Sequence, residues 1–239
     1  MDETEMVTER LGRAESVAVL TGAGISAESG VPTFRGGGGA AVWKGMRFDQ
    51  ISSAEMVRKD LPAVWEWFDY RRGVLRECEP NLAHQAIAEW QDRFDSLTIV
   101  TQNIDGLHNA AGSRDVIEVH GNIHRSRCVA CSKLFQMDRD TVPHDPDACD
   151  CGSPVRPDVV LFGEMLPGGA YEKGAEAAAS CDVFFTIGTS ALVYPAAMLP
   201  EIAKQSGAFV VEVNPEETPL TSICDVSLRG LAGEILPLI

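Results

Sequence analysis

Two glycines, Gly22 and Gly24, closely follow the short apolar run at residues 17–20. Such a turn at the exit of a strand lets the backbone approach a pyrophosphate at the start of the next helix, so it predicts a nucleotide-binding loop. Plain turns use the same order of residues, and on this stretch alone that alternative stays open. The second strand that usually carries an acidic residue is missing, because four glycines occupy residues 36–39. A dinucleotide would therefore not be bound as in an ordinary dehydrogenase.

Four of the seven cysteines form two close pairs, Cys128 with Cys131 and Cys149 with Cys151. Two such pairs across a gap of about 17 residues are typical of a zinc ribbon with four thiolate ligands. Since neither pair contains a histidine, we expect a closed, structural site. The second pair has one intervening residue where two are commoner, so a chance cluster or a disulfide stays open. A nucleic-acid-binding ribbon is disfavoured, because residues 138–150 are rich in aspartate rather than basic.

Short polar side chains follow two successive predicted strands. Gln102, Asn103 and Asp105 come directly after the first, at residues 97–101, and His120 comes directly after the next. Parallel sheets place their chemistry at the carboxyl ends of strands, so we expect these groups at one edge. An imidazole there suits a general base, because its unperturbed pKa is about 6.5. A histidine bonded only to backbone is the alternative for His120, and the other histidines carry no such context.

Strands and helices that alternate along the chain must position these residues. Apolar runs, each followed by Gly, Ser, Thr, Asn or His, predict strands at residues 17–20, 97–101, 116–119, 159–162, 183–187 and 209–213. Helices are predicted before Arg13, from about Asp60, and after Asn81 as a cap. Ser52 and Glu55 form a predicted capping box. The order predicts an α/β fold with an open, Rossmann-like parallel sheet that binds a nucleotide at its carboxyl edge.

Composition limits the class of protein. The chain has 239 residues and a formal charge of −15, which suits one large domain with a smaller one attached. This acidity disfavours nucleic acid and anionic membranes as partners and favours a locally basic one, such as a lysine-bearing peptide. No apolar run could span a membrane, and the N-terminal residues do not resemble a signal peptide. Because Cys78, Cys181 and Cys224 are scattered, we expect free thiols and a cytoplasmic protein.

Taken together, these motifs closely resemble one family, the sirtuins, which are NAD-dependent protein-lysine deacylases. The matching stretches occur in the family's order and are residues 22–35, 101–108, 118–121, the four paired cysteines, 162–164 and 188–190. The resemblance implies a Rossmann-like domain of residues 1–36, 82–124 and 157–239. It implies a smaller domain from two insertions, a helical one at 37–81 and a zinc-bearing one at 125–156. NAD and acyl-lysine would meet between the two domains.

The resemblance also implies roles for individual residues. Those implied for NAD binding are Gly22, Ala23, Gly24, Ile25, Phe34, Arg35, Gln102, Asn103, Asp105, Gly188, Thr189, Ser190, Asn214 and Ala232. Those implied for the acyl-lysine peptide, held as an added strand, are Phe68, Arg71, Val159, Val160, Phe162, Gly163, Glu164, Val193 and Tyr194. The implied catalytic residues are His120, Asn103 and Asp105, and the implied zinc ligands are Cys128, Cys131, Cys149 and Cys151.

The family's reaction fits these residue types. As nicotinamide leaves, positive charge develops on the ribose, and the acyl oxygen of the lysine captures that carbon only if it is held close by. His120 would then take a proton from a ribose hydroxyl as general base. The implied products are nicotinamide, acyl-ADP-ribose and free lysine.

One position departs from the most similar branch of the family. Residues 65–72 and 193–197 look most like class III sirtuins, which bind succinyl- or malonyl-lysine with a Tyr-x-x-Arg pair. This chain keeps Arg71 but has Phe68 at the tyrosine position, and Tyr70 lies roughly 200° around the helix. A lost hydrogen bond to a charged group costs on the order of 1.5–3 kcal/mol, about one to two decades in preference. We therefore expect deacetylation, with desuccinylation and demalonylation weaker.

Other functions remain as alternatives. Desuccinylation or demalonylation could be the main activity if Arg71 suffices. ADP-ribosyl transfer or NAD hydrolysis would need no acyl-lysine tunnel, and the intact peptide segments at 162–164 and 193–194 argue against both. A silent NAD sensor or scaffold is disfavoured because the three implied catalytic residues occur together. We expect acyl-lysine proteins or peptides as partners of a monomeric enzyme.

Overall fold

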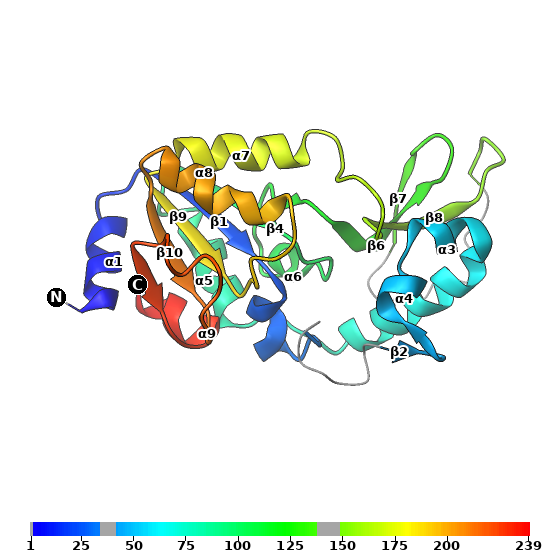
Figure 1. Ribbon diagram of the computed structural model, residues 1–239, viewed down its shortest axis with the longest axis horizontal. Coiled ribbons are helices and arrows are strands. Elements are labelled where there is room, and N and C mark those ends of the chain that lie inside the picture. The colour runs from blue at the N-terminus through cyan, green and yellow to red at the C-terminus, as the bar shows by residue number, and fades with distance from the viewer. Residues whose placement is uncertain (1, 34–41, 138–148) are drawn as a thin grey trace.

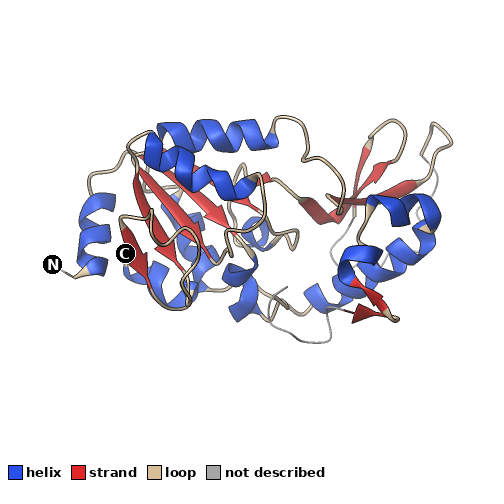
Figure 2. Cartoon of the chain, viewed as in Figure 1, coloured by secondary structure: helices blue, strands red, loops and turns tan. Residues whose placement is uncertain are grey.

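The computed structural model describes residues 2–33, 42–137 and 149–239. Its largest element is a six-stranded parallel sheet with the strand order β11-β10-β9-β1-β4-β5 (Figures 1 and 2). The strands are β1 (Ser16–Thr21), β4 (Ser96–Thr101), β5 (Ile117–Glu118), β9 (Val183–Ile187), β10 (Phe209–Val213) and β11 (Val226–Leu228). The predicted α/β fold with an open parallel sheet is confirmed.

Both faces of this sheet are buried under helices, as a parallel sheet requires. Side chains alternate along β1, so that Val17 and Val19 enter the core on one face while Ala18 and Leu20 enter the core on the other. The helices on the first face are α1 (Glu3–Leu11), α5 (Leu82–Trp90) and α9 (Ala232–Ile235). Those on the second face are α7 (Ala170–Ser180) and α8 (Leu199–Gln205) (Figure 1). Within the described residues, no helix is long and apolar enough to cross a bilayer.

Strand β1 lies where the order of the strands reverses. From β1 the chain adds β4 and β5 on one side, and later β9, β10 and β11 on the other. The connections that follow β1 and β9 therefore lead to opposite sides of the sheet from adjacent strand ends, which is where parallel sheets bind ligands. The loop after β1 continues into a short 3₁₀ helix, η1 (Ala23–Ser29), and the one after β4 leads to α6 (Leu107–Ala110).

Three glycines pack the β1 and β9 loops backbone against backbone. The Gly22 N–H donates to Ile187 O at 3.0 Å, and the Gly24 N–H donates to Gly188 O at 2.7 Å. A Cβ on Gly188 would lie 2.3 Å from Ile25 N, and Gly188 has a φ of +58°. The sequence predicts that Gly22 and Gly24 let the backbone approach a pyrophosphate. In the structure, the space a Cβ would fill is already taken by the facing loop.

A second group of elements lies at the opposite end of the molecule from α1 (Figure 1). Three antiparallel strands in the order β7-β6-β8 form its sheet: β6 (Gly121–Cys128), β7 (Leu134–Gln136) and β8 (Val155–Val159). Beside it lie the hairpin of β2 (Val42–Trp43) and β3 (Met46–Arg47) and the helices α2 (Phe48–Ile51), α3 (Ala54–Lys59) and α4 (Leu61–Leu75). The short helices η3 (Ala196–Met198) and η4 (Leu236–Leu238) complete the named elements.

The strand predicted at 159–162 is wrong in position and in sheet. The observed strand is β8, which ends at Val159 and pairs antiparallel with β6 outside the parallel sheet. Phe162 leaves that sheet because its N–H donates to Ser52 O at 2.9 Å while its C=O accepts the Ala54 N–H at 3.1 Å. Pairing with a distant segment has overridden the local apolar pattern.

Of the predicted helix starts, two are confirmed and one is displaced. Asp60 caps α4 and Asn81 caps α5, each accepting backbone N–H groups of the first turn. The capping box predicted at Ser52 and Glu55 is wrong, because α3 is capped by Ser53, whose Oγ accepts the Met56 N–H at 3.1 Å. The Ser52 hydroxyl instead accepts the indole N–H of Trp67 at 2.8 Å.

Replacing Gly188 with Ala should destabilise the fold strongly. The new Cβ strains the positive φ and overpacks the facing backbone, so we expect a loss of about 2–4 kcal/mol in the free energy of unfolding. Gly207 is the matched control, because its φ is +95° and no atom lies within 4 Å of a Cβ built there. Gly207→Ala should cost only the backbone strain of about 1–2 kcal/mol. Urea denaturation measures both, and equal losses would contradict the packing argument.

Candidate active site

The loops that follow β1 and β4 are joined by hydrogen bonds between polar side chains. Ser26 in η1 donates to Asp105 Oδ2 at 2.8 Å, and the Leu107 N–H donates to Asp105 Oδ1 at 2.9 Å. Asn103 Nδ2 donates to Gly22 O and to Ser26 Oγ, both at 3.1 Å. Burial raises the pKa of Asp105, and the hydrogen bonds from the Leu107 N–H and the Ser26 hydroxyl, together with the charge of Arg71, oppose the rise. Two of the predicted catalytic residues, Asn103 and Asp105, thus lie together.

Two buried histidines support this arrangement from behind. The Nε2 of His84 lies 3.4 Å from Ser26 Oγ, and its Nδ1 lies 3.0 Å from Oδ1 of the cap residue Asn81. His108 Nε2 lies 3.0 Å from Thr21 Oγ1, and the two imidazole rings are 5.0 Å apart. Burial lowers the pKa of His84 to about 4 and that of His108 to about 3, so both rings are neutral near pH 7. They act as hydrogen-bonding supports rather than as charges.

Sequence reasoning missed Ser26 and His84 as parts of the site. Ser26 stood inside the recognised glycine-loop motif, and His84 stood three residues after the predicted cap Asn81. The cap was the available signal, since a residue in the first turn of a helix points back past its N-terminus.

His120 follows β5, the strand next to β4, and is oriented by the backbone. Its Nδ1 lies 2.8 Å from Gln102 O, so the N–H at Nδ1 donates to that carbonyl. With the proton on Nδ1, the lone pair of the neutral ring is on Nε2, which makes no hydrogen bond within the described part of the chain. Burial lowers the pKa of His120, and the bond to Gln102 opposes the change. This state is the one a proton acceptor needs.

The residues predicted to bind NAD lie mostly along the same edge. Gln102 Nε2 donates to Thr189 Oγ1 at 3.0 Å, which joins the loops after β4 and β9. Asn214 follows β10, and Ala232 begins α9, whose Gly233 N–H donates to Glu28 Oε2 of η1 at 2.8 Å. The predicted set that the structure describes along these loops comprises Gly22, Ala23, Gly24, Gln102, Asn103, Asp105, Gly188, Thr189, Ser190, Asn214 and Ala232.

Three predicted NAD residues stand apart from that set. Ile25 is completely buried in the main core cluster, and its carbonyl accepts the Asn81 amide at 2.7 Å. Phe34 and Arg35 lie outside the described residues.

Helix α4 presents Arg71 toward the same edge. The guanidinium of Arg71 lies 5.8 Å from the centre of the Phe68 ring and 5.7 Å from that of Trp67. Burial lowers the pKa of Arg71 to about 10, and the charge of Asp105 opposes that change. Phe68 is completely buried, whereas Tyr70 is 51% exposed and its ring centre lies 4.6 Å from that of Trp43. Tyr70 therefore turns away from Phe68, as the helix geometry predicts.

The segment at residues 159–164, which is predicted to pair with the peptide, is held in place by hydrogen bonds that its backbone N–H groups donate. The Val160 N–H donates to His120 O at 2.9 Å, and the Leu161 N–H donates to Glu164 Oε2 at 2.9 Å. Gly163 has a φ of +85° in the turn that follows, and the side chain of Phe162 is 53% exposed. Of the other predicted peptide residues, Val193 and Tyr194 are exposed after β9, whereas Val159 is buried in the core.

The four paired cysteines converge as predicted. The Sγ atoms of Cys128 and Cys151 are 3.5 Å apart, those of Cys131 and Cys149 are 3.6 Å apart, and all four lie within 4.8 Å of one another. A tetrahedral zinc ion with Zn–S bonds of about 2.3 Å would hold its sulfurs about 3.8 Å apart. The Ala130 and Cys131 N–H groups point at Cys128 Sγ at 3.4 and 3.5 Å. This donor set fits a structural zinc site.

The cysteine module packs against α4. Trp65 lies in one buried cluster with Cys128, Cys149 and Val155, and its indole N–H donates to Val155 O at 2.9 Å. The cysteines thus also anchor the helix that carries Phe68 and Arg71.

Comparisons with known proteins agree with this geometry. The model of the Sir2 family matches residues 22–195. The chain is 45% identical over 231 residues to NAD-dependent protein deacylase 2 of Pyrobaculum aerophilum, covering 97% of this chain and 92% of that protein. It is similar to a solved Sir2 homologue in complex with NAD, with a TM-score of 0.88, 42% identity and coverage of 100% and 92%. It is also similar to a Sir2 structure with a deacetylated p53 peptide and 3′-O-acetyl ADP-ribose, with a TM-score of 0.85, 30% identity and coverage of 99% and 97%.

These matches extend over nearly the whole chain and include the loops after β1, β4 and β9 as well as the converging cysteines. The resemblance drawn from the sequence motifs is thereby confirmed. The chain belongs to the Sir2 family.

Proposed function

We propose that this chain removes acyl groups from protein lysine side chains with NAD as co-substrate, yielding nicotinamide, acyl-ADP-ribose and free lysine. The observation that carries the proposal is the placement of His120. Its Nδ1 is held by Gln102 O, and its Nε2 carries the lone pair. The backbone carbonyl of His120 accepts the N–H of Val160, which belongs to the segment predicted to pair with the peptide. The proton acceptor is thus hydrogen-bonded directly to the segment that would bind the acyl-lysine.

The residues present fit NAD at the carboxyl ends of β1, β4 and β9. Polar side chains of Gln102, Asn103, Thr189 and Ser190 lie along this edge, at the reversal of the strand order where dinucleotides bind. NAD supplies a ribose carbon that becomes electrophilic when nicotinamide leaves. Asp105 holds Ser26 and orders the backbone at Leu107, so it would orient the groups that face the ribose.

His120 performs the proton transfer in this proposal. A ribose hydroxyl becomes a nucleophile when Nε2 accepts its proton, and the bond from Nδ1 to Gln102 O stabilises the resulting imidazolium. Positioned general bases of this kind contribute about 10²–10⁴-fold to a rate.

Phe68 and Arg71 support acetyl over dicarboxylic acyl groups. The Phe68 side chain is wholly buried and offers no hydroxyl, so the pocket it would border is apolar. The positive charge of Arg71 already interacts with Asp105, which reduces what it can offer to a second carboxylate. Deacetylation is the main activity in this proposal, and desuccinylation and demalonylation are weaker.

We propose the domain boundaries predicted from the sequence, with residues 37–81 and 125–156 as the smaller domain and the remainder as the larger. In support, the two core clusters of the parallel sheet draw on the larger part. The cluster around Phe68 and the one around Cys128 draw mainly on the smaller. The roles of Phe34 and Arg35 in NAD binding, a monomeric state and a cytoplasmic location also belong to the proposal. In support of that location, Cys78, Cys181 and Cys224 form no disulfide, which suits a reducing compartment.

The substitution His120→Ala should lower kcat for deacetylation by about 10²–10⁴-fold, because it removes the proton acceptor. Mass spectrometry of an acetyl-lysine peptide, with and without NAD, measures this loss. Exchange of labelled nicotinamide into NAD should remain measurable, since that step needs no base at the ribose hydroxyl. NAD consumption without deacylation by the wild type would point to NAD hydrolysis or ADP-ribosyl transfer instead.

The pH profile of kcat/KM should fall on the acid side at a pH below about 6.5, the ordinary pKa of histidine. The base must be neutral, and burial lowers the pKa of His120, so the neutral form persists to lower pH. Initial rates between pH 5 and 8 locate this limb. A limb clearly above the ordinary pKa would contradict the assignment.

The substitution Phe68→Tyr should raise the ratio of desuccinylation to deacetylation by about one to two decades, because it adds a hydroxyl beside Arg71 that can bind a carboxylate. Competition between acetyl- and succinyl-lysine forms of one peptide measures the ratio. Tyr70→Phe is the matched control, since it removes one hydroxyl from the exposed side of the same helix and should leave the ratio unchanged. A wild type that already prefers succinyl-lysine would show that Arg71 suffices.

The substitution Cys128→Ser should abolish stoichiometric zinc and lower the melting temperature, by roughly 6–12 °C for each 3 kcal/mol lost. Metal analysis of the wild type should find one zinc ion per chain. Cys181→Ser is the control, because Cys181 lies outside the four-cysteine cluster and should keep both zinc and stability. Full stability of a zinc-free Cys128→Ser variant would exclude a structural role.

A further inference from the structure

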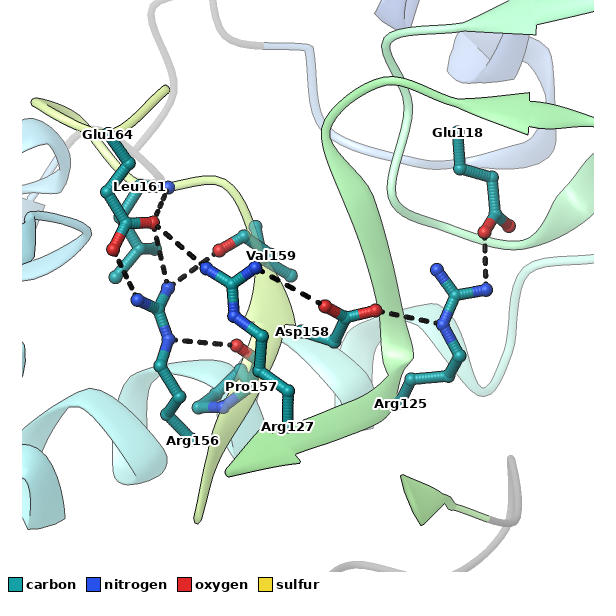
Figure 3. A network of polar contacts seen from close by, with 9 residues as sticks. All are labelled: Glu118, Arg125, Arg127, Arg156, Pro157, Asp158, Val159, Leu161 and Glu164. Carbon is teal, nitrogen blue, oxygen red and sulfur yellow. Dashed lines mark hydrogen bonds and ion pairs between the residues drawn. The ribbon is translucent and has the colours of Figure 1, made fainter. Parts of the chain in front are cut away.

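A line of alternating charges runs from the strand before His120 to the peptide segment (Figure 3). It contains three carboxylates and three guanidinium groups: Glu118, Asp158 and Glu164 with Arg125, Arg127 and Arg156. The charges balance within the line, and most of these side chains are largely buried. A fully exposed ion pair would carry little weight, whereas removing one partner from this line leaves a poorly solvated charge.

Arg125 is the second group in this line, counted from Glu118. Its Nη1 donates to Glu118 Oε2 at 2.6 Å, and its Nε donates to Asp158 Oδ2 at 3.0 Å (Figure 3). The Glu118 side chain is 10% exposed and that of Asp158 is 11% exposed. One planar guanidinium thus bridges two nearly buried carboxylates that belong to different sheets, Glu118 to β5 and Asp158 to β8.

These two carboxylates flank the backbone around His120. Glu118 lies two residues before His120, and its Oε1 accepts the side-chain amide of Asn122, two residues after it, at 2.6 Å. On the other side, a Cβ at Gly121 would lie 2.1 Å from Asp158 O, so β8 passes directly against the residue that follows His120. Arg125 therefore fastens the turn that carries His120 to the strand beside it.

The same strand continues into the peptide segment. Beyond Val159, the Val160 N–H donates to His120 O, and the carboxylate of Glu164 shapes the next turn by accepting the Leu161 N–H. Arg156 holds that carboxylate in a two-pronged ion pair and donates to Val159 O at 2.7 Å. Any shift of β8 relative to β5 thus changes the distance between His120 and the acyl-lysine segment.

We propose that Arg125 is a positioning residue for deacylation. By bridging Glu118 and Asp158, it sets the separation between His120 and residues 159–164, the segment that would bind the acyl-lysine peptide. This inference rests on the base proposed at His120. Arg125 touches neither substrate in this role, and it acts through the backbone that it fastens.

The test compares four variants of the full chain for kcat, for KM of NAD and acetyl-peptide, and for nicotinamide exchange. Arg125→Met should lower kcat for deacylation by about 10- to 100-fold, because displacements near 1 Å at a reacting centre cost up to about 10²-fold. Its KM for NAD should stay unchanged, since the NAD residues lie on the loops after β1, β4 and β9. Arg125→Lys should recover part of the loss, because an ammonium pairs with one carboxylate where the guanidinium bridges two.

Arg127→Met is the matched control for charge. Arg127 lies two residues further along β6 with a similar exposed fraction, 27% against 24%, but it reaches Asp158 and Glu164 only at 3.8 and 3.5 Å. The Arg127→Met substitution removes the same charge from the same line but leaves Arg125 between Glu118 and Asp158, so kcat of this variant should fall much less. Arg114→Met, at an exposed arginine paired with Asp92, should leave all parameters unchanged.

Equal losses of kcat in Arg125→Met and Arg127→Met would overturn the proposal, as would an Arg125→Met variant that raises KM for NAD while kcat is retained. If Arg125→Met does not fold, Asp158→Asn and Arg125→Lys carry the comparison, and both must lower kcat with KM for NAD unchanged. Failure of the proposed function gives a different result. In that case His120→Ala keeps its kcat, which refutes the base and this inference together.

Discussion

The close approach of two backbone turns, with no side chain between them, fixes the relative position of the polar groups at the sheet edge. Gly22 and Gly24 donate to the last carbonyls of the β9 turn, and Gly188 leaves no room for a Cβ against Ile25 N. Because backbone atoms cannot change rotamer, this contact is less adjustable than any side-chain packing. The hydrogen bond from Ser26 to Asp105 then links the loops after β1 and β4, and the one from Gln102 to Thr189 links the loops after β4 and β9.

Polar groups beneath this edge are buried in a neutral or compensated state. His84 and His108 lose their charge because burial lowers the pKa of each well below neutrality. Asp105 is partly compensated by two hydrogen bonds and by the charge of Arg71. A buried polar group without partners would be costly, so these contacts favour one arrangement of the site over alternatives. The helix α4 and the cysteine module contribute to the same arrangement, since Trp65 of α4 packs against Cys128 and Cys149.

Much of the fold could be predicted from local patterns, because the central strands are continuous apolar runs buried on both faces. Strands β1 and β9 follow that rule most closely, whereas β4 contains threonines and begins exposed, and β10 contains Glu212. The caps Asp60 and Asn81 mark helix starts as their chemistry requires. Strand β6 could not be recognised, because its sequence Gly-Asn-Ile-His-Arg-Ser-Arg-Cys is neither an apolar run nor an alternation of apolar and polar residues. Its partners β7 and β8 are what make it a strand, and those pairings depend on tertiary structure. The cysteine site was predictable from spacing alone, whereas the support that His84 gives to Ser26 joins segments 58 residues apart and leaves no local pattern.

The pairing of β1 with β9 also has a consequence for synthesis of the chain. Val17 pairs with Val183, so the central strand of the sheet cannot acquire its second neighbour until about three quarters of the chain has been made. At translation rates of about 5–20 residues per second, this delay is on the order of 8–33 s. Throughout that interval the apolar strand has at least one open hydrogen-bonding edge, and it has two until β4 is complete; such edges are the kind of surface that pairs with other chains. A chain with this topology depends on early cover for β1, which α5 and β4 can supply because both are complete by residue 101.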